Sequence, residues 1–193
     1  MTIVIINYGA GNIQSIKFAI QRLGHQAILS NDPEEIKTAD KVIFPGVGEA
    51  SSAMQKLKDS RLDVLIPELK QPILGICLGM QLMCNHTEEG NTKGLGIFDV
   101  DVIRFNKDVK VPQIGWNQIE ALDSPLFNGI NEKEYIYLVH SYYAPITKNT
   151  VAQTSYGVTY STALQKNNFY GTQFHPEKSS VTGEKILENF LKL

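Results

Sequence analysis

Residues 72–79 read Pro-Ile-Leu-Gly-Ile-Cys-Leu-Gly. The apolar run predicts a buried strand, and the glycines on either side of Cys77 predict a sharp turn from that strand into a helix. Glycine suits both positions because a side chain there would crowd the strained backbone of such a turn. The stretch therefore indicates a strand–turn–helix unit that presents a cysteine where the G-x-S-x-G elbow presents its serine. The alternative is a small buried cysteine on a tight turn.

The same alternation extends toward the N-terminus. We expect strands over residues 2–7, 26–30 and 41–44, helices over residues 13–23, 49–57 and 62–70, and a further helix that begins after Asn31 or Asp32. Strands that alternate with helices at this spacing favour a parallel sheet covered on both faces.

The second half of the chain has a different pattern. From about residue 96 to residue 174 it is rich in Val, Ile, Thr, Tyr and Phe, with turn signals at residues 106–108, 123–125 and 128–129. This predicts antiparallel strands and hairpins, followed by a helix over residues 181–193. Because no repeat or linker-like stretch interrupts the chain, we expect one domain over residues 1–193, with an α/β fold of three layers and a mainly parallel central sheet.

Composition excludes several classes of partner. The 193 residues carry 18 Lys and Arg against 20 Asp and Glu, a net charge of -2, so no basic field favours nucleic acid or an anionic membrane. We find no apolar stretch that suits a signal peptide or a spanning helix. Only two cysteines occur, too few for a disulfide framework. We therefore expect a cytoplasmic protein with free thiols, no nucleic acid and no membrane.

A second motif can complete the chemistry of Cys77. Residues 171–177 read Gly-Thr-Gln-Phe-His-Pro-Glu, which places His175 at the end of a predicted strand, with Pro176 forcing the chain out of it. Glu177 can hydrogen-bond the imidazole and fix its tautomer. Taken alone, a histidine near the end of a chain is more often structural or solvated. Paired with the cysteine elbow, the motif favours a triad in which Cys77 attacks, His175 transfers protons and Glu177 orients the histidine.

These two motifs resemble the signatures of the class I, triad-type glutamine amidotransferases, in order and separation. The resemblance implies a flavodoxin-like three-layer fold and hydrolysis of the side-chain amide of glutamine, through a glutamyl thioester, to glutamate and ammonia. Nothing in composition or periodicity identifies glutamine. The histidines show no metal-ligand spacing, so we expect no metal, and we expect no cofactor.

Further stretches narrow the resemblance to one branch of the family. Residues 7–12, 45–48, 115–117, 140–143 and 175–179 resemble the glutaminase subunits of imidazole glycerol phosphate synthases. This implies a heterodimer with a separate cyclase subunit that receives the ammonia in histidine biosynthesis. It also implies that Asn12, Trp116 and Lys178 face that partner. Gln113 departs from the pattern, which usually has His there, and we interpret it as a tolerated change near the interface.

The remaining site residues follow from the elbow and the resemblance. The oxyanion should meet the Leu78 N–H, by the geometry of the elbow, and the Val47 N–H, from a loop whose flanking glycines let the Gly46–Val47 peptide rotate. The resemblance implies a substrate site that contains Gly46, Gly48, Gln81, Glu89, Ser141 and Tyr142. In it Glu89 pairs with the substrate ammonium, and Ser141 and Tyr142 act through their backbones. The alternatives are a plain turn at the Val47 loop, a surface position for Gln81 and a solvated Glu89.

Three rival functions stay open at this point. Gly9-Ala10-Gly11 follows a strand and precedes a helix, as in dinucleotide-binding modules, but Gln14 occupies the third glycine position. A peptidase or gamma-glutamyl hydrolase on the same scaffold would share the triad and need no partner. A glutaminase that serves another synthase would need a partner protein, because we find no ammonia-accepting domain in the sequence.

The second cysteine, Cys84, is expected to be an inert buried thiol.

Overall fold

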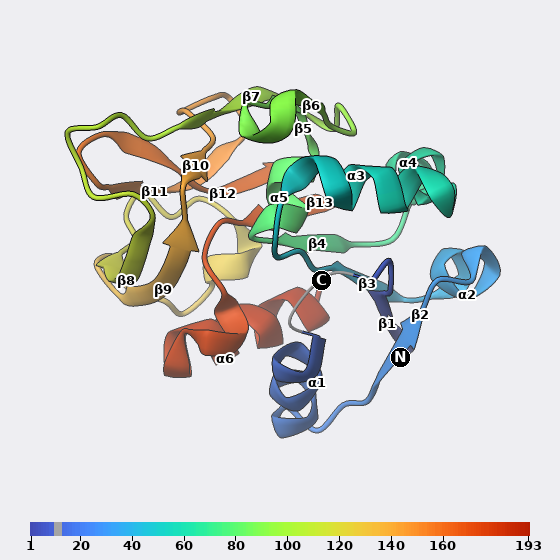
Figure 1. Cartoon of the computed structure of the whole chain (residues 1–193). Coiled ribbons are helices and arrows are strands. Elements are labelled where there is room, and N and C mark those ends of the chain that lie inside the picture. Colours follow the sequence, from blue (N-terminus) through green and yellow to red (C-terminus); the bar gives the residue numbers. More distant parts are fainter. Residues whose placement is uncertain (10–12) are drawn as a thin grey trace.

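A computed structural model describes residues 1–9 and 13–193 and shows three layers built on a central sheet (Figure 1). Its seven strands follow the order β11-β12-β13-β4-β3-β1-β2. The strands β2, β1, β3, β4 and β13 run parallel, which is the flavodoxin-like order. In chain order the first half consists of β1 (Ile3–Ile6), α1 (Ile13–Arg22), β2 (Ala27–Ser30), α2 (Pro33–Thr38), β3 (Lys41–Phe44), α3 (Ala50–Asp59), α4 (Leu62–Leu65), η1 (Ile66–Glu68), β4 (Ile73–Ile76) and α5 (Leu78–Leu82).

The second half adds two smaller sheets and completes the large one. A four-stranded sheet has the order β10-β7-β5-β6, and a two-stranded ribbon pairs β8 with β9. The elements are β5 (Cys84–Thr87), η2 (Glu89–Asn91), β6 (Thr92–Lys93), β7 (Phe98–Arg104), β8 (Gln113–Gln118), η3 (Pro125–Phe127), β9 (Tyr135–His140), β10 (Tyr142–Tyr143), β11 (Thr150–Ser155), β12 (Thr159–Lys166), β13 (Phe169–Thr172), η4 (Pro176–Lys178) and α6 (Ser180–Leu191).

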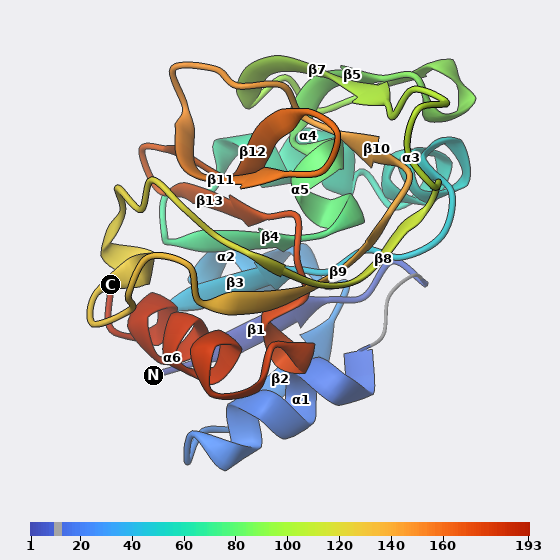
Figure 2. The ribbon, with the colours of Figure 1, turned by 90° about the vertical axis from the view of Figure 1, so that its left-hand side faces the viewer.

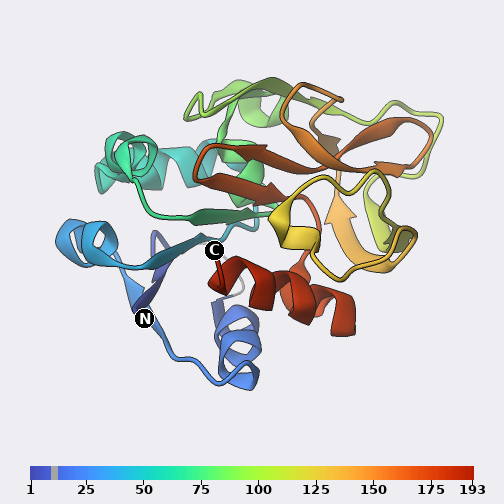
Figure 3. The same ribbon diagram turned by 180° about the vertical axis from the view of Figure 1, so that it is seen from behind.

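Both faces of the parallel strands are covered, as the apolar runs predict. Every residue of β1, β3, β4 and β13 is buried. Helices α1 and α6 cover one face and helices α3 and α4 the other (Figures 2 and 3). Each face has its own hydrophobic cluster, one built with residues of α3 and α4 and the other with residues of α1 and α6. No helix in the described ranges is long and apolar enough to cross a membrane.

Two expectations need correction. The helix expected over residues 62–70 ends at Leu65 and continues as the short 3-10 turn η1, because Pro67 removes a helix N–H. The second half is also not purely antiparallel. Strand β13 pairs parallel with β4, and β5, which the sequence pattern does not predict, pairs parallel with β7.

The pairing of β4 with β13 brings the cysteine motif and the histidine motif to one edge of the sheet. Ile76 lies beside Thr172 in parallel register, so the two strands end side by side. The Cys77 N–H continues the ladder by donating to the Thr172 carbonyl at 2.7 Å. Two segments about 100 residues apart in sequence, one ending in Cys77 and the other leading to His175, therefore emerge at the same edge.

Candidate active site

Cys77 occupies a strained elbow between β4 and α5. Its backbone has φ +52° and ψ −109°, outside the regions that non-glycine residues ordinarily adopt. Such strain persists only where the surroundings hold it, and it gathers at functional sites. The side chain is 7% exposed, and its thiol reaches the Val139 carbonyl at 3.9 Å. The elbow expected from the glycine pattern is therefore present.

The glycines around this elbow allow two backbones to touch. A Cβ on Gly79 would lie 2.0 Å from the Phe44 carbonyl oxygen, and one on Gly46 would lie 2.6 Å from the Gly79 nitrogen. The loop after β3 therefore packs directly on the start of α5. This contact brings Val47, which follows Gly46, to the elbow. Gly48 takes φ +96°, which a side chain would oppose.

His175 follows β13 and is held from two sides. Its Nδ1 lies 2.9 Å from Glu177 Oε1, and the side chains are 3% and 1% exposed. Its backbone N–H donates to the Tyr137 carbonyl at 3.0 Å. Burial lowers the pKa of His175, but hydrogen bonds to Cys77 and Glu177 outweigh burial and raise that pKa from 6.5 to about 10. The geometry therefore favours a protonated imidazole beside the sulfur.

A pocket of about 200 Å³ opens beside these groups. It gathers the elbow, the Val47 loop, the segment after β9 and the histidine in one place. Its lining consists of Val47, Gly48, Cys77, Leu78, Gln81, Glu89, Val139, His140, Ser141, Tyr142 and His175. Of the residues expected at the catalytic and substrate sites, Gly46 and Glu177 alone are not part of the lining. Gly46 adjoins the elbow, and Glu177 lies behind the imidazole.

Gln81 is not a surface residue. It is 4% exposed, and its Nε2 donates to the Tyr142 carbonyl at 3.0 Å and to Gln173 Oε1 at 2.9 Å. The surface alternative for Gln81 is therefore wrong. Glu89 is partly buried, with Oε2 accepting from the Ala50 N–H at 3.0 Å. Burial raises the pKa of Glu89, as expected for a carboxylate that faces a pocket.

The carbonyls of Ser141 and Tyr142 are already engaged within the chain. The Ser141 oxygen accepts from the Phe105 N–H at 3.1 Å. The Tyr142 oxygen accepts from Gln81 and also from His140 Nδ1 at 2.8 Å. Contacts between this segment and a ligand would therefore fall mainly to its N–H groups.

A family model, described as glutamine amidotransferase class-I, matches residues 4–193. The chain belongs to the class-I glutamine amidotransferases. It is 55% identical over 196 residues to imidazole glycerol phosphate synthase subunit HisH from Bacteroides fragilis strain YCH46, with both chains fully covered. Identity is 54% to the subunit of that name from Bacteroides thetaiotaomicron and 44% to the one from Yersinia pestis, again over the full length of each.

Solved structures show the same fold at lower identity. A putative GMP synthase protein from Thermoplasma acidophilum superposes with a TM-score of 0.77 at 20% identity, over 100% of this chain and 92% of that one. PurLQS from Thermotoga maritima gives a TM-score of 0.76 at 17% identity, over 99% and 97%. These similarities concern the fold. The full-length HisH relatives place this glutamine amidotransferase within the HisH family.

The residues expected at or near the partner face of this amidotransferase differ in exposure. Trp116 is 52% exposed, and Lys178 is exposed as well. Asn12 lies outside the described residues. Gln113 is buried, 4% exposed, and accepts at Oε1 from the Tyr160 hydroxyl at 2.9 Å. The departure at Gln113 therefore faces the interior of this amidotransferase and not its surface.

Two features of this amidotransferase are not predicted by the sequence pattern. Gln173 is fully buried, and its Nε2 lies 3.7 Å from Cys77 Sγ. Only the register of β13 beside β4 places Gln173 next to Cys77, and the sequence alone does not give that register. Tyr135 is 54% exposed on β9, one strand away from Trp116. Cys84 is fully buried and its pKa is raised by burial, which confirms the expectation of a second, enclosed thiol.

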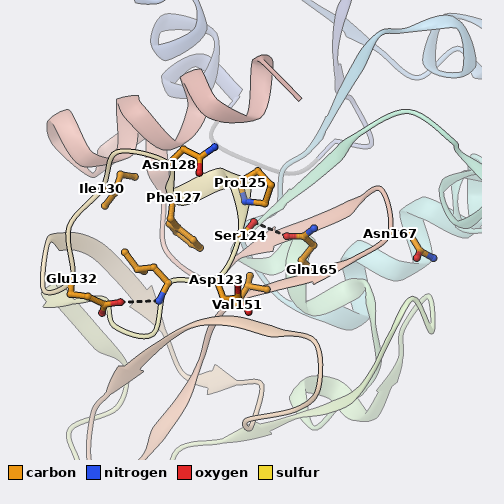
Figure 4. A pocket seen from close by; sticks show the side chains of 11 residues that line it. Asp123, Ser124, Pro125, Phe127, Asn128, Ile130, Glu132, Val151, Gln165 and Asn167 are labelled. Carbon is orange, nitrogen blue, oxygen red and sulfur yellow. Dashed lines mark hydrogen bonds between the residues drawn. The ribbon is translucent and has the colours of Figure 1, made fainter.

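A larger cavity of this amidotransferase lies away from the elbow. It measures about 680 Å³ and is walled by the 122–132 segment, β11 and the end of β12 (Figure 4). Ser124 donates to Gln165 Oε1 at 2.6 Å, and Glu132 accepts from the backbone N–H groups of Ala121 and Leu122. Its lining contains no cysteine or histidine. The smaller pocket at the elbow is therefore the candidate active site.

Proposed function

We propose that this amidotransferase hydrolyses the side-chain amide of glutamine through a Cys77–His175–Glu177 triad and passes the ammonia to a separate cyclase subunit. In this proposal the cyclase makes imidazole glycerol phosphate and the aminoimidazole carboxamide ribonucleotide by-product of histidine biosynthesis. The observation that carries it is Cys77 on a strained elbow beside a buried His175–Glu177 pair. Family membership and the HisH relatives support the substrate and pathway.

The chemistry divides between the sulfur and the imidazole. The high pKa of His175 favours transfer of the thiol proton to the imidazole, leaving a Cys77 thiolate. The thiolate attacks the amide carbon to form a tetrahedral intermediate. The imidazolium gives its proton to the leaving nitrogen, the C–N bond breaks, and ammonia departs, which leaves the glutamyl thioester. His175 then takes a proton from water as the water attacks the thioester, and the sulfur leaves as a thiolate. Glu177 keeps the imidazole in the tautomer these steps require.

The oxyanion of each tetrahedral intermediate needs donors that are already in place. The Leu78 N–H, next to the nucleophile, is one, and the Val47 N–H is the other when the Gly46–Val47 peptide turns it inward. Close packing of Gly46 on Gly79 supports this assignment, because it holds the loop against the elbow. Losing one such donor costs roughly 10² to 10³ in rate in a comparable hydrolase.

The glutamine substrate would lie among the remaining residues of the pocket. Both amide hydrogens of Gln81 are used within the chain, so its Oε1 is the atom free to accept from the substrate. Glu89 supplies negative charge for the substrate ammonium. The N–H groups of Ser141 and Tyr142, with the backbone of Gly46 and Gly48, can meet the carboxylate.

An exposed apolar face on the β8–β9 ribbon supports the proposal that this protein binds a partner. Ile114, Trp116 and Tyr135 are 62%, 52% and 54% exposed, and the register of β8 and β9 places them on one side of the ribbon. The other side of β9 is buried. We call these three residues the apolar ribbon face. Tyr135 lies on β9, the strand that ends in the pocket residues Val139 and His140, and Ile114 pairs with Val139 across the ribbon. We assign it, with Lys178 and Asn12, to the cyclase interface.

Two further proposals concern the whole chain. Residues 1–193 act as one glutamine amidotransferase domain, because the sheet edge that carries Cys77 and His175 combines β4 from the first half with β13 from the second. The protein works in a reducing compartment, which we take to be the cytoplasm, because Cys77 must remain a free thiol.

The direct experiment is a glutaminase assay on the purified chain, alone and with the cyclase in the presence of its ribonucleotide substrate. We expect weak hydrolysis by the chain alone and strong activation by the liganded partner. Full activity of the isolated chain, unchanged by the partner, would favour a stand-alone hydrolase. Activation by another synthase, such as GMP synthase, and not by the cyclase would reassign the partner.

A further inference from the structure

Gln173 is a fully buried polar residue at the nucleophile. It follows β13, one residue beyond the pairing of Thr172 with Ile76, so it emerges beside Cys77. Its backbone N–H donates to the Thr162 carbonyl at 2.8 Å, which fixes its position. Its carboxamide reaches Cys77 Sγ at 3.7 Å and Gln81 at 2.9 Å. The triad does not explain why a buried carboxamide lies between the proposed nucleophile Cys77 and the proposed substrate-binding residue Gln81.

A backbone carbonyl fixes which way both carboxamides point. The Tyr142 oxygen can only accept, so the Gln81 atom 3.0 Å from it must be the NH₂ nitrogen. The second hydrogen of that nitrogen points at the Gln173 carboxamide, which must present its oxygen. The NH₂ group of Gln173 is then left facing the sulfur. The usual ambiguity between amide O and N is therefore removed for both side chains.

The neighbours of the Cys77 sulfur differ in the charge state that they favour. A neutral thiol can donate to the Val139 carbonyl, 3.9 Å away, but a thiolate cannot. An N–H aimed at the sulfur stabilises the thiolate, and such a bond is stronger where water is excluded. Val139 therefore favours the thiol and Gln173 the thiolate. The imidazolium of His175 acts in the same direction as Gln173.

We propose that Gln173 is a catalytic residue whose side-chain N–H stabilises the Cys77 thiolate, while its oxygen fixes the Gln81 amide so that Gln81 offers only an acceptor to the substrate. The proposal rests on the proposed role of Cys77 as the nucleophile. It assigns one carboxamide to two tasks. The bond to sulfur governs reactivity, and the bond to Gln81 governs substrate binding.

The test measures the thiol without substrate. The rate of Cys77 alkylation by iodoacetamide is followed against pH by peptide mapping, for the parent and for Gln173→Met, which removes the donor at similar size. We expect the midpoint of the rate profile to rise by about one pH unit, and the rate at neutral pH to fall about tenfold. Gln173→Glu, which keeps the shape but adds a negative charge, should shift the midpoint further in the same direction.

Gln113→Met is the matched control, because Gln113 is also buried but accepts a hydrogen bond from Tyr160 and does not contact the sulfur. It should keep the parent profile. Circular dichroism and thermal unfolding establish that each variant is folded. A folded Gln173→Met or Gln173→Glu with the parent midpoint would overturn the proposal. Since alkylation needs no turnover, this result is separate from the test of Cys77 as nucleophile, which is loss of glutamine hydrolysis in Cys77→Ala.

The second task has its own readout in steady-state kinetics. If Gln173 orients Gln81, Gln173→Met should raise KM for glutamine as well as lower kcat. Gln81→Met should raise KM but leave the alkylation profile close to that of the parent, because the sulfur keeps its donor. An unchanged KM in folded Gln173→Met would overturn the orienting task.

Discussion

His175 Nδ1 and Glu177 Oε1 lie 2.9 Å apart, with both side chains almost completely excluded from water. Because a carboxylate oxygen only accepts, Nδ1 carries the hydrogen and Nε2 is left for the sulfur and the leaving group. The second oxygen of Glu177 has no hydrogen-bond partner among the described residues. The carboxylate therefore directs its charge mainly at the imidazole.

Replacing Glu177 with Gln should lower kcat for glutamine by roughly 10² to 10⁴, because the neutral amide can hold the wrong tautomer and cannot stabilise the imidazolium. KM should change little, since Glu177 does not line the pocket. Steady-state kinetics of the partner-activated enzyme measure both constants. Glu184→Gln is the control and should match the parent, because Glu184 is a partly exposed residue of α6 that pairs with Arg22 and does not line the pocket. An unchanged kcat in Glu177→Gln would make Glu177 a bystander.

Replacing Val47 with Pro should leave the protein folded but prevent its activation, because proline removes the proposed oxyanion donor. The fully activated rate should fall roughly 10² to 10³-fold. Val47→Ala keeps the N–H and should be activated as the parent is. Glutaminase assays with the liganded cyclase measure this. If a folded, partner-bound Val47→Pro enzyme reached the parent's activated rate, the Val47 donor would be wrong.

Buried His140 should make stability depend on pH. Burial is the main cause that lowers its pKa from 6.5 to about 4. Between these values the unfolded chain binds a proton that the folded chain does not, so unfolding becomes easier as pH falls from 6.5 to 4. The contribution lost over this window is about 3 kcal/mol. Urea unfolding of the parent and His140→Gln at pH 6.5 and 4.5 tests this, and equal pH dependence in the two proteins would contradict it.

The apolar ribbon face should carry binding energy for the partner. Trp116→Ala should weaken association with the cyclase at least 30-fold, corresponding to about 2 kcal/mol or more for an aromatic anchor. Tyr135→Ala should weaken it in the same direction. Val64→Ala, which truncates a side chain 61% exposed on α4, is the control. Calorimetric titration measures the affinities, and a Trp116→Ala protein that binds as the parent does would remove this face from the interface.

Local chemistry made much of the fold predictable. Strand β3 has the expected bounds Lys41–Phe44, and Asp32 caps α2 by accepting from the N–H groups of Glu34 and Glu35. The elbow at Cys77 followed from its flanking glycines. In each case the signal lies within a few residues of the feature that it specifies.

Other features depend on pairings that local sequence does not specify. Gln173 touches the sulfur only because β13 lies beside β4, so its role could not be deduced from residues 171–177 alone. The ribbon reverses the usual pattern, with Gln113 buried and Ile114 and Trp116 exposed on β8. Polarity alone would orient this strand the wrong way round, because its apolar side is open in the isolated chain.

The central claim is that Cys77 is the nucleophile, and covalent labelling tests it most directly. The partner-activated enzyme is treated with an electrophilic glutamine analogue, and the modified peptide is identified by mass spectrometry, with glutamine protection as the specificity control. We predict label on Cys77 alone, abolished in Cys77→Ser together with glutamine hydrolysis, and none on fully buried Cys84. Label mainly on Cys84, or full glutamine turnover by a folded Cys77→Ser protein, would contradict the account.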